Sequence, residues 1–284
     1  MVVMVLANSI KAWLSIARIG NDIALGIGTI IGYILGGGSR ISDMIIVFIV
    51  GVCLGAGGNI VNDYFDRYVD AVNKPWRPIP SGVISAATAY RVSILLLTVG
   101  ILMAFYLSYT NGFIALSAAI LVYLYSYKLK SVLLLGNIVV AFLVGLSIIF
   151  GGAASMLNMD VIIASLFAFL LNVGREFLKG IEDIKGDKIM NIRTLATVYG
   201  VFKAYVLAVI VFIILVVLSF IPYLFFSYSI IYLILAVGVD LTILFSLYIT
   251  RDLLPDSAFK ATRLLKISVF LGLFAFLLNR LVIY

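Results

Sequence analysis

The stretch Asn62-Asp63-Tyr64-Phe65-Asp66-Arg67-Tyr68-Val69-Asp70 comes directly after a long apolar run of the sequence. On a helix, Asn62, Asp66 and Asp70 are spaced i, i+4 and i+8, so they fall within a stripe of about 80°, with Asp63 on its edge. The carboxylates repel one another unless a cation lies between them, and a charged side chain costs on the order of 3 kcal/mol at mid-bilayer. We therefore predict that this helix end binds metal through Asn62, Asp63, Asp66 and Asp70. A solvated helix end without metal is the simpler alternative.

A second group of acids closes a later apolar run, and the two groups together hold more than half of the 13 acidic residues. Asp183 and Asp187 are again spaced i, i+4, while Glu176 lies two turns before Asp183 and Glu182 about 100° away around the helix. We predict that the two acid faces meet across one cavity, although a charged loop would explain the second group alone. Asp183 and Asp187 join the predicted metal ligands. The predicted catalytic acids are Asp66, Asp70, Asp183 and Asp187.

The kind of metal follows from the ligands that the chain lacks. It has no histidine, and its single cysteine, Cys53, lies inside an apolar run. Imidazole ligands and a disulfide framework are therefore excluded. The remaining oxygen donors favour a hard cation, and Mg²⁺ typically binds one or two carboxylates together with substrate phosphates. We predict Mg²⁺ as the cofactor, with a diphosphate between the two acid faces.

The composition indicates an integral membrane protein built from helices. Of the 284 residues, 64% are hydrophobic and only 12% are charged, whereas soluble domains average about 25% charged residues. Spanning helices need roughly 20 apolar residues each. The apolar runs predict nine of them, at residues 18–36, 44–66, 88–108, 111–127, 133–152, 160–180, 201–221, 228–249 and 264–282.

The basic residues predict how this arrangement lies in the membrane. All but Arg40 and Arg280 of the 20 Lys and Arg residues fall on one side of it. The positive-inside rule places that side in the cytoplasm. The N-terminus and both acid groups are thus predicted to be cytoplasmic, and the C-terminus lies outside. The same rule explains the net charge of +7 without nucleic acid as a partner.

A weak internal repeat relates the two acid groups. Each is followed by a short basic loop, an Asn (Asn73 and Asn191) and an Arg (Arg77 and Arg193). The second group lies four predicted helices after the first. Repeats are common in membrane folds, so we predict two similar four-helix halves plus a ninth helix, in a single transmembrane domain over residues 1–284.

The loop after the first acid group, residues 73–82, holds three of the five prolines. Proline fixes φ and stiffens a loop, so Lys74 and Arg77 are placed to reach back to a phosphate. Lys179 is interleaved with the second acid group. We predict Lys74, Arg77 and Lys179 as substrate-binding residues. A basic loop at the membrane surface with Trp76 at the interface is the alternative.

A function of another class, a cation transporter or channel, also uses acids within a membrane. The acid groups lie on one side and form no relay across the bilayer, which argues against it. Asp240 is the only other acid deep in a predicted span, and we interpret it as a hydrogen-bonded packing residue.

The two acid motifs, on predicted helices two and six of nine, together with the loop 73–82, resemble the UbiA superfamily of intramembrane prenyltransferases. The resemblance covers roughly residues 10–283. It implies a nine-helix α bundle around a central cavity that opens sideways to membrane lipids. It also implies an isoprenyl diphosphate donor bound through Mg²⁺. No protein partner is predicted.

Positions outside the acid motifs also match the superfamily. They lie in an Arg-x-x-Asn motif of the first helix, at the basic end of helix four, and in the loop after the second motif. The substrate-binding residues that these matches imply are Asn21, Tyr125, Lys130 and Arg193. Lys128, also at the end of helix four, is implied to take part in catalysis.

Within the superfamily, the loop and the second motif look most like archaeal enzymes of ether-lipid biosynthesis. The resemblance implies Mg²⁺-dependent transfer of a geranylgeranyl group from geranylgeranyl diphosphate to the free hydroxyl of geranylgeranylglyceryl phosphate, a lipid phosphate, with release of diphosphate. Chlorophyll synthases carry a similar loop, so a chlorophyllide or aromatic quinone-precursor acceptor is the alternative. One departure is Gly180, where many members have an acid. Either Glu176 or Glu182 compensates, or the second metal is held more weakly.

Overall fold

The computed structural model describes residues 2–189 and 192–283, and every regular element within these ranges is a helix. Asn191, which is part of the predicted repeat, lies outside them. The chain divides into two compact units, which we call unit 1 (Met1–Leu129 with Phe150–Met156) and unit 2 (Lys130–Ile149 with Leu157–Tyr284). The boundary falls close to the predicted junction of the two halves, at the end of the fourth predicted span.

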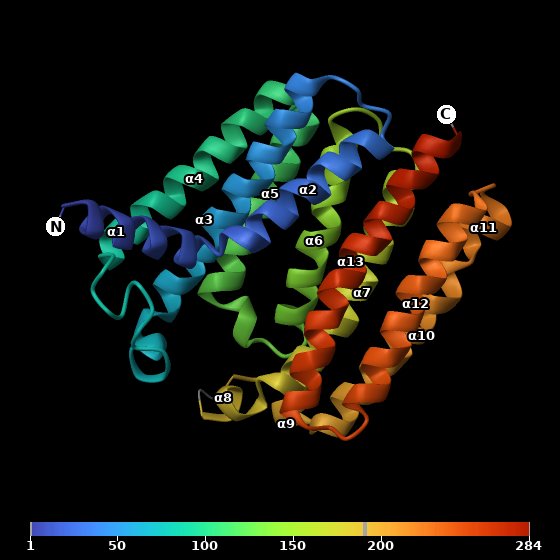
Figure 1. Cartoon of the computed structure of the whole chain (residues 1–284). Helices are drawn as coiled ribbons and strands as arrows, with labels where there is room; N and C mark the ends of the chain where they lie inside the picture. Colours follow the sequence, from blue (N-terminus) through green and yellow to red (C-terminus); the bar gives the residue numbers. More distant parts are fainter. Residues whose placement is uncertain (1, 190–191, 284) are drawn as a thin grey trace. The chain divides into compact units, whose positions relative to one another are not determined.

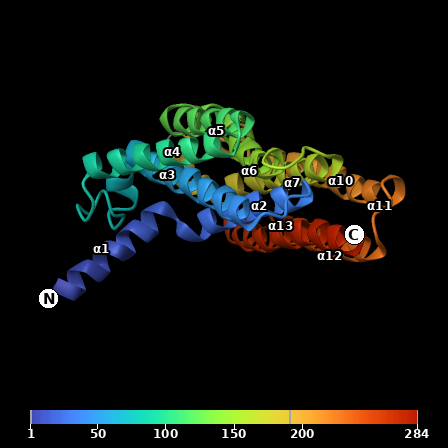
Figure 2. The same cartoon turned by 90° about the horizontal axis from the view of Figure 1, so that it is seen from above.

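Unit 1 contains the first four predicted spans and one helix that was not predicted (Figure 1). Helix α1 leaves α2 at an angle of 51°, and the break lies at Arg18 (Figure 2). Helix α3 continues well past the predicted end of its span, so the whole first acid group is helical. The helices of unit 1 are α1 (Val2–Ala17), α2 (Ile19–Leu35), α3 (Ile41–Asn73), α4 (Ala86–Leu107) and α5 (Tyr109–Tyr127).

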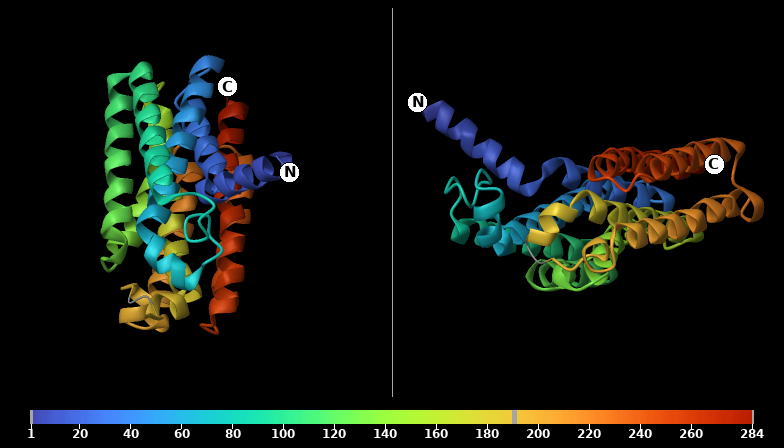
Figure 3. Two further views of the ribbon diagram at one scale, coloured as in Figure 1. Left: turned by 90° about the vertical axis from the view of Figure 1, so that its left-hand side faces the viewer. Right: turned by 90° about the horizontal axis from the view of Figure 1, so that it is seen from below.

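Unit 2 contains the later spans and the short helices between them. Its core comes from α7, α10, α12 and α13, and α12 and α13 run side by side (Figures 1 and 3). The 3₁₀ turn η1 (Leu129–Ser131) leads into α6, whose last turn belongs to unit 1. The other helices are α6 (Leu135–Ala153), α7 (Met159–Glu182), α8 (Ile184–Ile189), α9 (Leu195–Val198), α10 (Val201–Ser219), α11 (Ile221–Phe225), α12 (Ile230–Thr250) and α13 (Pro255–Ile283).

Length and apolarity confirm the prediction of an all-α membrane protein. Among the described residues, eight helices are long and apolar enough to cross a membrane, and the bent pair α1–α2 makes a ninth when it counts as one span. The predicted last span began too late, because α13 starts at Pro255. Proline suits the first turn of a helix, where its missing N–H leaves no bond unmade.

Short polar side chains begin several of these helices. Ser85, Ser108, Asn158 and Ser229 each accept a hydrogen bond from a backbone N–H in the first turn of α4, α5, α7 and α12. Such caps satisfy donors that have no partner within the helix. They mark helix starts that hydrophobicity alone leaves uncertain by several residues.

The glycines of α3 allow close packing within unit 1. A Cβ on Gly57 would lie 2.8 Å from Leu97 of α4, and one on Gly58 would lie 2.8 Å from Val122 of α5. One on Gly55 would lie 2.8 Å from the Asp22 carboxylate of α2. Three neighbouring helices therefore approach α3 through positions that have no side chain.

The deep acid Asp240 confirms its predicted structural role. Its side chain is buried, and the Ser219 hydroxyl donates a hydrogen bond to it over 2.7 Å within unit 2. A buried polar group with a partner stabilises packing and needs no functional explanation.

We expect Gly151→Ala to destabilise the protein by about 1–3 kcal/mol, the usual range for overpacking. A Cβ on Gly151 would overlap the Thr29 carbonyl oxygen of α2, a backbone atom that cannot rotate away. The matched control is Gly238→Ala in α12, where a Cβ meets open space within 4 Å. Melting temperatures of both variants in detergent test this, and equal melting temperatures would contradict the close approach of α6 and α2.

Candidate active site

The first acid group lies on the last turns of α3, and two of its carboxylates contact arginines. The side chains of Asp63 and Asp70 are only 7% and 6% exposed. The Arg77 guanidinium donates to Asp63 Oδ1 at 3.2 Å and to Asp70 Oδ2 at 2.6 Å. Asp63 and Asp70 are two turns apart, so one guanidinium bridges both. This ion-pair arrangement neutralises them within unit 1.

Asn62 and Asp66 form a second pair on the same helix. The Asn62 amide donates to Asp66 Oδ2 at 3.2 Å, and both side chains are half-buried. This contact confirms that the i, i+4 spacing brings the two groups together on a regular helix. Together they offer an amide oxygen and a carboxylate, which are hard donors suited to Mg²⁺.

The loop that carries Arg77 is folded rather than extended. Arg77 N–H donates to the Lys74 carbonyl, and Ser81 N–H donates back to the Arg77 carbonyl, each at 2.9 Å. Ile79 and Ile84 of the loop are buried in one cluster with Ile16 of α1. These contacts set the position of Arg77, whereas Lys74 stays exposed at the end of α3.

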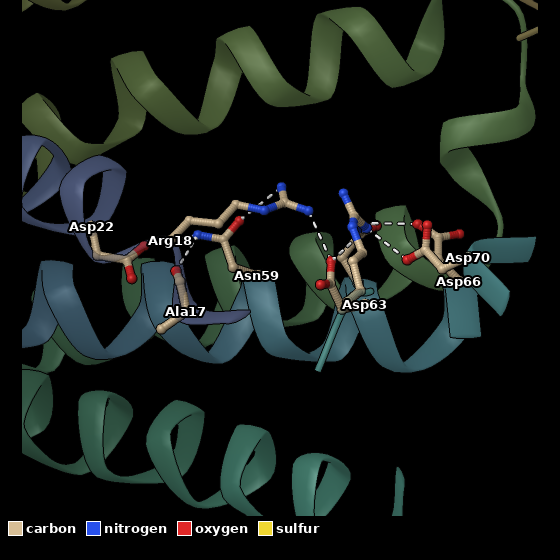
Figure 4. A network of polar contacts seen from close by, with 9 residues as sticks. Ala17, Arg18, Asp22, Asn59, Asp63, Asp66 and Asp70 are labelled. Carbon is tan, nitrogen blue, oxygen red and sulfur yellow. Dashed lines mark hydrogen bonds and ion pairs between the residues drawn. The ribbon is translucent and has the colours of Figure 1, made fainter. Parts of the chain in front are cut away.

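The break between α1 and α2 brings a second arginine to the first acid group. Arg18 has φ 57° and ψ 50°, a left-handed conformation that is uncommon outside glycine. Its guanidinium donates to Asp63 Oδ1 at 2.8 Å and to Asn59 Oδ1 at 3.3 Å. Figure 4 shows Arg18 reaching along α3 to these partners. Asp63 Oδ1 thus accepts from arginines of two different segments.

The Asn59 side chain also contacts residues on both sides of the break between α1 and α2. Its amide donates to the Ala17 carbonyl at 2.9 Å and to Asp22 Oδ1 at 2.8 Å (Figure 4). Asp22 is 1% exposed, and its Oδ2 is buried without a hydrogen-bond partner among the described residues. A buried acceptor without a partner costs about 1–3 kcal/mol. Such a cost is tolerated where the arrangement serves a purpose, here the orientation of Asn59 and Arg18.

Sequence reasoning included Arg18 only as the arginine of the Arg-x-x-Asn motif that ends at Asn21, and it missed Asn59 and Asp22. A signal was present, because Asn59 lies four residues before Asp63 and Asp22 lies four residues after Arg18. Polar residues at i, i+4 inside apolar runs share a helix face. Asn21, the predicted binding residue, is exposed, while the adjacent Asp22 is buried.

The second acid group lies where α7 ends and α8 begins. Asp183 follows the last residue of α7, and Asp187 N–H donates to the Asp183 carbonyl at 2.9 Å, so the helical spacing persists across the junction. Asp183 is exposed and Asp187 is half-buried. As in the first group, two carboxylates at i, i+4 lie at one end of a long helix.

The two glutamates near Gly180 each have a partner within unit 2. The Arg175 guanidinium donates to Glu176 Oε1 at 3.0 Å, and the Thr262 hydroxyl of α13 donates to Glu182 Oε2 at 2.6 Å. Both carboxylates therefore stabilise local contacts within unit 2. Whether either replaces an acid at Gly180 stays a prediction.

The other predicted residues lie near the ends of helices. Tyr125 and Lys128 are at the end of α5, Lys130 is in η1, Lys179 is in the last turn of α7, and Arg193 is exposed before α9. Within the described ranges, no three Asp, Glu or Cys side chains converge on one point as a closed metal site. The Asn62–Asp66 and Asp183–Asp187 pairs belong to different units, and their meeting across one cavity stays a prediction.

Comparisons with known proteins give a consistent result. Residues 25–278 match the sequence model of the UbiA prenyltransferase family. A digeranylgeranylglyceryl phosphate synthase from Sulfurisphaera tokodaii is 38% identical, over 96% of this chain and 99% of that protein. A solved structure of digeranylgeranylglyceryl phosphate synthase is 33% identical, with a TM-score of 0.81 over 96% of this chain and 99% of that one.

A more distant solved structure shares the fold. It is a UbiA homologue from Archaeoglobus fulgidus bound to GPP and Mg²⁺, 16% identical, with a TM-score of 0.73 over 93% of this chain and 99% of that one.

Proposed function

The chain belongs to the UbiA prenyltransferase family, and we propose that it transfers a geranylgeranyl group from geranylgeranyl diphosphate to the free hydroxyl of geranylgeranylglyceryl phosphate. The observation that carries this proposal is the identity of 38% and 33% to two digeranylgeranylglyceryl phosphate synthases over 96% of the chain. The family makes the chain a multi-pass membrane prenyltransferase and not a cation transporter. The choice of acceptor rests on the two relatives.

We propose that a divalent metal, Mg²⁺, serves the reaction. Asn62 and Asp66 in unit 1, with Asp183 and Asp187 in unit 2, would hold it together with the donor diphosphate. The fit rests on hard oxygen donors in i, i+4 pairs, which leave coordination positions for phosphate oxygens. When bound, the metal supplies positive charge that stabilises the departing diphosphate.

The chain's own residues prepare both substrates in this proposal. Arg77 is held beside the acid group and carries donors that suit phosphate oxygens. The C–O bond to the diphosphate breaks as the acceptor hydroxyl oxygen bonds to the allylic carbon, and the hydroxyl proton leaves to a carboxylate, water or phosphate. Asp70, Lys128, Lys74 and Lys179 keep their predicted roles beside this centre. The remaining proposed substrate-binding residues are Asn21, Tyr125, Lys130 and Arg193.

The orientation in the membrane is also a proposal. The basic side of the helix arrangement favours a cytoplasmic N-terminus and cytoplasmic acid groups. Membrane lipids would surround the bundle, and no protein partner is proposed.

The test is a prenyl-transfer assay on the purified full chain with labelled geranylgeranyl diphosphate, geranylgeranylglyceryl phosphate and Mg²⁺. We expect a doubly prenylated lipid phosphate that disappears with EDTA and returns when Mg²⁺ is added back. Binding of the diphosphate without this product would move the acceptor to a chlorophyllide or aromatic compound. Product formation that EDTA leaves unchanged would overturn the metal proposal.

A further inference from the structure

Four basic side chains gather where α7 packs against α13 in unit 2. Arg175 and Lys179 lie four residues apart on one face of α7, and Arg263 and Lys266 lie three apart on α13. The Arg175 Nε–H donates to the Thr262 carbonyl oxygen at 3.3 Å, and this contact joins the two faces. We call Arg175, Lys179, Arg263 and Lys266 the α7–α13 basic cluster.

The acids near this cluster are already engaged. Glu176 accepts from Arg175, and Glu182 accepts from the Thr262 hydroxyl at 2.6 Å. Among the described residues, Lys179, Arg263 and Lys266 have no ion-pair partner within 4.0 Å. Asp183 lies one turn beyond Lys179, and even with this third acid the four cations leave an excess of positive charge at this place.

Lys266 lies within this excess of positive charge. The charged groups that act on its ammonium are Arg175, Lys179 and Arg263, which repel it, and Glu182, which attracts it. Repulsion between neighbouring cations destabilises the unliganded arrangement and is relieved by a bound anion. The cluster is therefore better suited to hold an anion than to be left in solvent.

The shape of the cluster favours one kind of anion. Arg175 is only 14% exposed and stiffly held, and the Arg263 guanidinium stacks 4.2 Å from the Phe259 ring centroid. Guanidinium groups present several fixed donors, and lysines add point charges, a combination that suits a phosphate dianion. Basic pockets between membrane helices near an interface bind lipid head groups in this way. Exposed apolar side chains, Ile267 and Phe270, follow Lys266 along α13 and suit a lipid chain.

A basic rim, in which the positive-inside rule keeps Lys and Arg on the cytoplasmic side, explains why these side chains are positively charged. It does not explain why they converge. Such a rim requires only that Lys and Arg remain on one side of the membrane. Here the two helices contact through a guanidinium, and the flanking lysines lie one turn away on each helix. A basic rim does not require basic side chains from two helices to converge.

We propose that the α7–α13 basic cluster binds a lipid-borne phosphomonoester, and that its occupant is the phosphate of the lipid acceptor. The identity of the occupant rests on the function proposed above. The binding of a phosphomonoester does not, because it follows from the charges and contacts of α7 and α13. A bulk anionic phospholipid is the competing source of the same head-group chemistry.

The test variant is Lys266→Gln, with Lys260→Gln as the matched control. Both lysines are exposed on α13, and both changes remove one charge, so neither should unfold the protein. We expect Lys266→Gln to raise the acceptor KM on the order of tenfold. The donor KM and the turnover of the dephosphorylated acceptor, geranylgeranylglycerol, should stay near those of the unmodified chain. Lys260→Gln should change none of these values.

A binding experiment separates failure of this inference from failure of the proposed function. Detergent-solubilised protein is titrated with phosphatidic acid, a phosphomonoester, and with phosphatidylglycerol, a phosphodiester. We expect phosphatidic acid to bind more tightly than phosphatidylglycerol to the unmodified chain and to Lys260→Gln. Only Lys266→Gln should lose this preference. If the phosphomonoester binds in this way but the protein does not turn over the acceptor, the binding site stands and the proposed acceptor is rejected. Equal binding of both lipids, or equal losses in both variants, would show a non-specific basic rim and overturn the inference.

Discussion

Replacing Asp66 or Asp183 by alanine is expected to lower prenyl-transfer turnover on the order of 10³-fold or more, with the protein still folded. Removing one preorganised group that stabilises developing charge already costs about 10²–10³-fold. Each of these carboxylates is proposed to hold the charge that neutralises the diphosphate, so its loss should be at least as severe. Asp66 is half-buried beside Asn62, and Asp183 is exposed beyond the last turn of α7. Neither substitution opens a large cavity.

The measurement is initial rate against Mg²⁺ concentration, with melting temperature as the check on folding. Asp256→Ala, an exposed acid in the first turn of α13, is the control for loss of one negative charge. We expect the control to turn over at the normal rate. Near-normal turnover in both Asp66→Ala and Asp183→Ala would remove the metal role from the two acid groups. A loss in only one would limit that role to its own unit.

Replacing Asp63 by asparagine is expected to lower the free energy of unfolding on the order of 3 kcal/mol, the low end for breaking a buried ion pair. The low end applies because the Arg18 and Arg77 side chains are 37% and 24% exposed and keep some solvation. The same Asp63 oxygen accepts from both arginines, so one substitution weakens both contacts. The arginine positions should loosen together, and the donor KM should rise.

Two measurements separate this positioning role from the predicted metal-ligand role of Asp63. If Asp63 holds the arginines, the Mg²⁺ concentration for half-maximal activity should not change in Asp63→Asn. The double variant Asp63→Asn with Arg77→Gln should then cost less than the sum of the single variants, because the two residues share one interaction. Additive costs with a large shift in Mg²⁺ dependence would instead make Asp63 a ligand. Asp256→Asn serves as the charge control for melting temperature.

The long helices could be predicted because they depend on local properties of the chain. A run of apolar residues long enough to cross a bilayer must satisfy its backbone hydrogen bonds internally, which makes it a helix. Among the described residues, the eight single spans and helix α2 of the bent pair follow the predicted runs, whereas α1 was not predicted. The exceptions were at ends and breaks. Helix α13 starts at Pro255 and α1 ends at Ala17, just before the break at Arg18, and both boundaries depend on proline and on polar contacts rather than on hydrophobicity.

The contact within the Asn62–Asp66 pair could be predicted from the sequence, but the arginine partners of Asp63 could not. The i, i+4 spacing on α3 indicated that Asn62 and Asp66 share a face, and their 3.2 Å contact confirms it. Spacing could not indicate that the Asp63 carboxylate contacts arginines, because Arg18 is 45 residues away and Arg77 is 14 residues away. An acid on the polar stripe of a helix has the same charge and the same spacing whether a metal or a guanidinium neutralises it. The sequence pattern therefore does not distinguish the two cases.

The sequence by itself determined a helical membrane protein with two acid motifs at the ends of long helices. Run length and helical periodicity act over a few residues and need no knowledge of neighbours. Only the tertiary structure decided which partners those acids have. The left-handed backbone at Arg18, the folded loop at Arg77 and the amide of Asn59 meet α3 through contacts between distant segments. Such contacts depend on packing geometry, which no local pattern encodes.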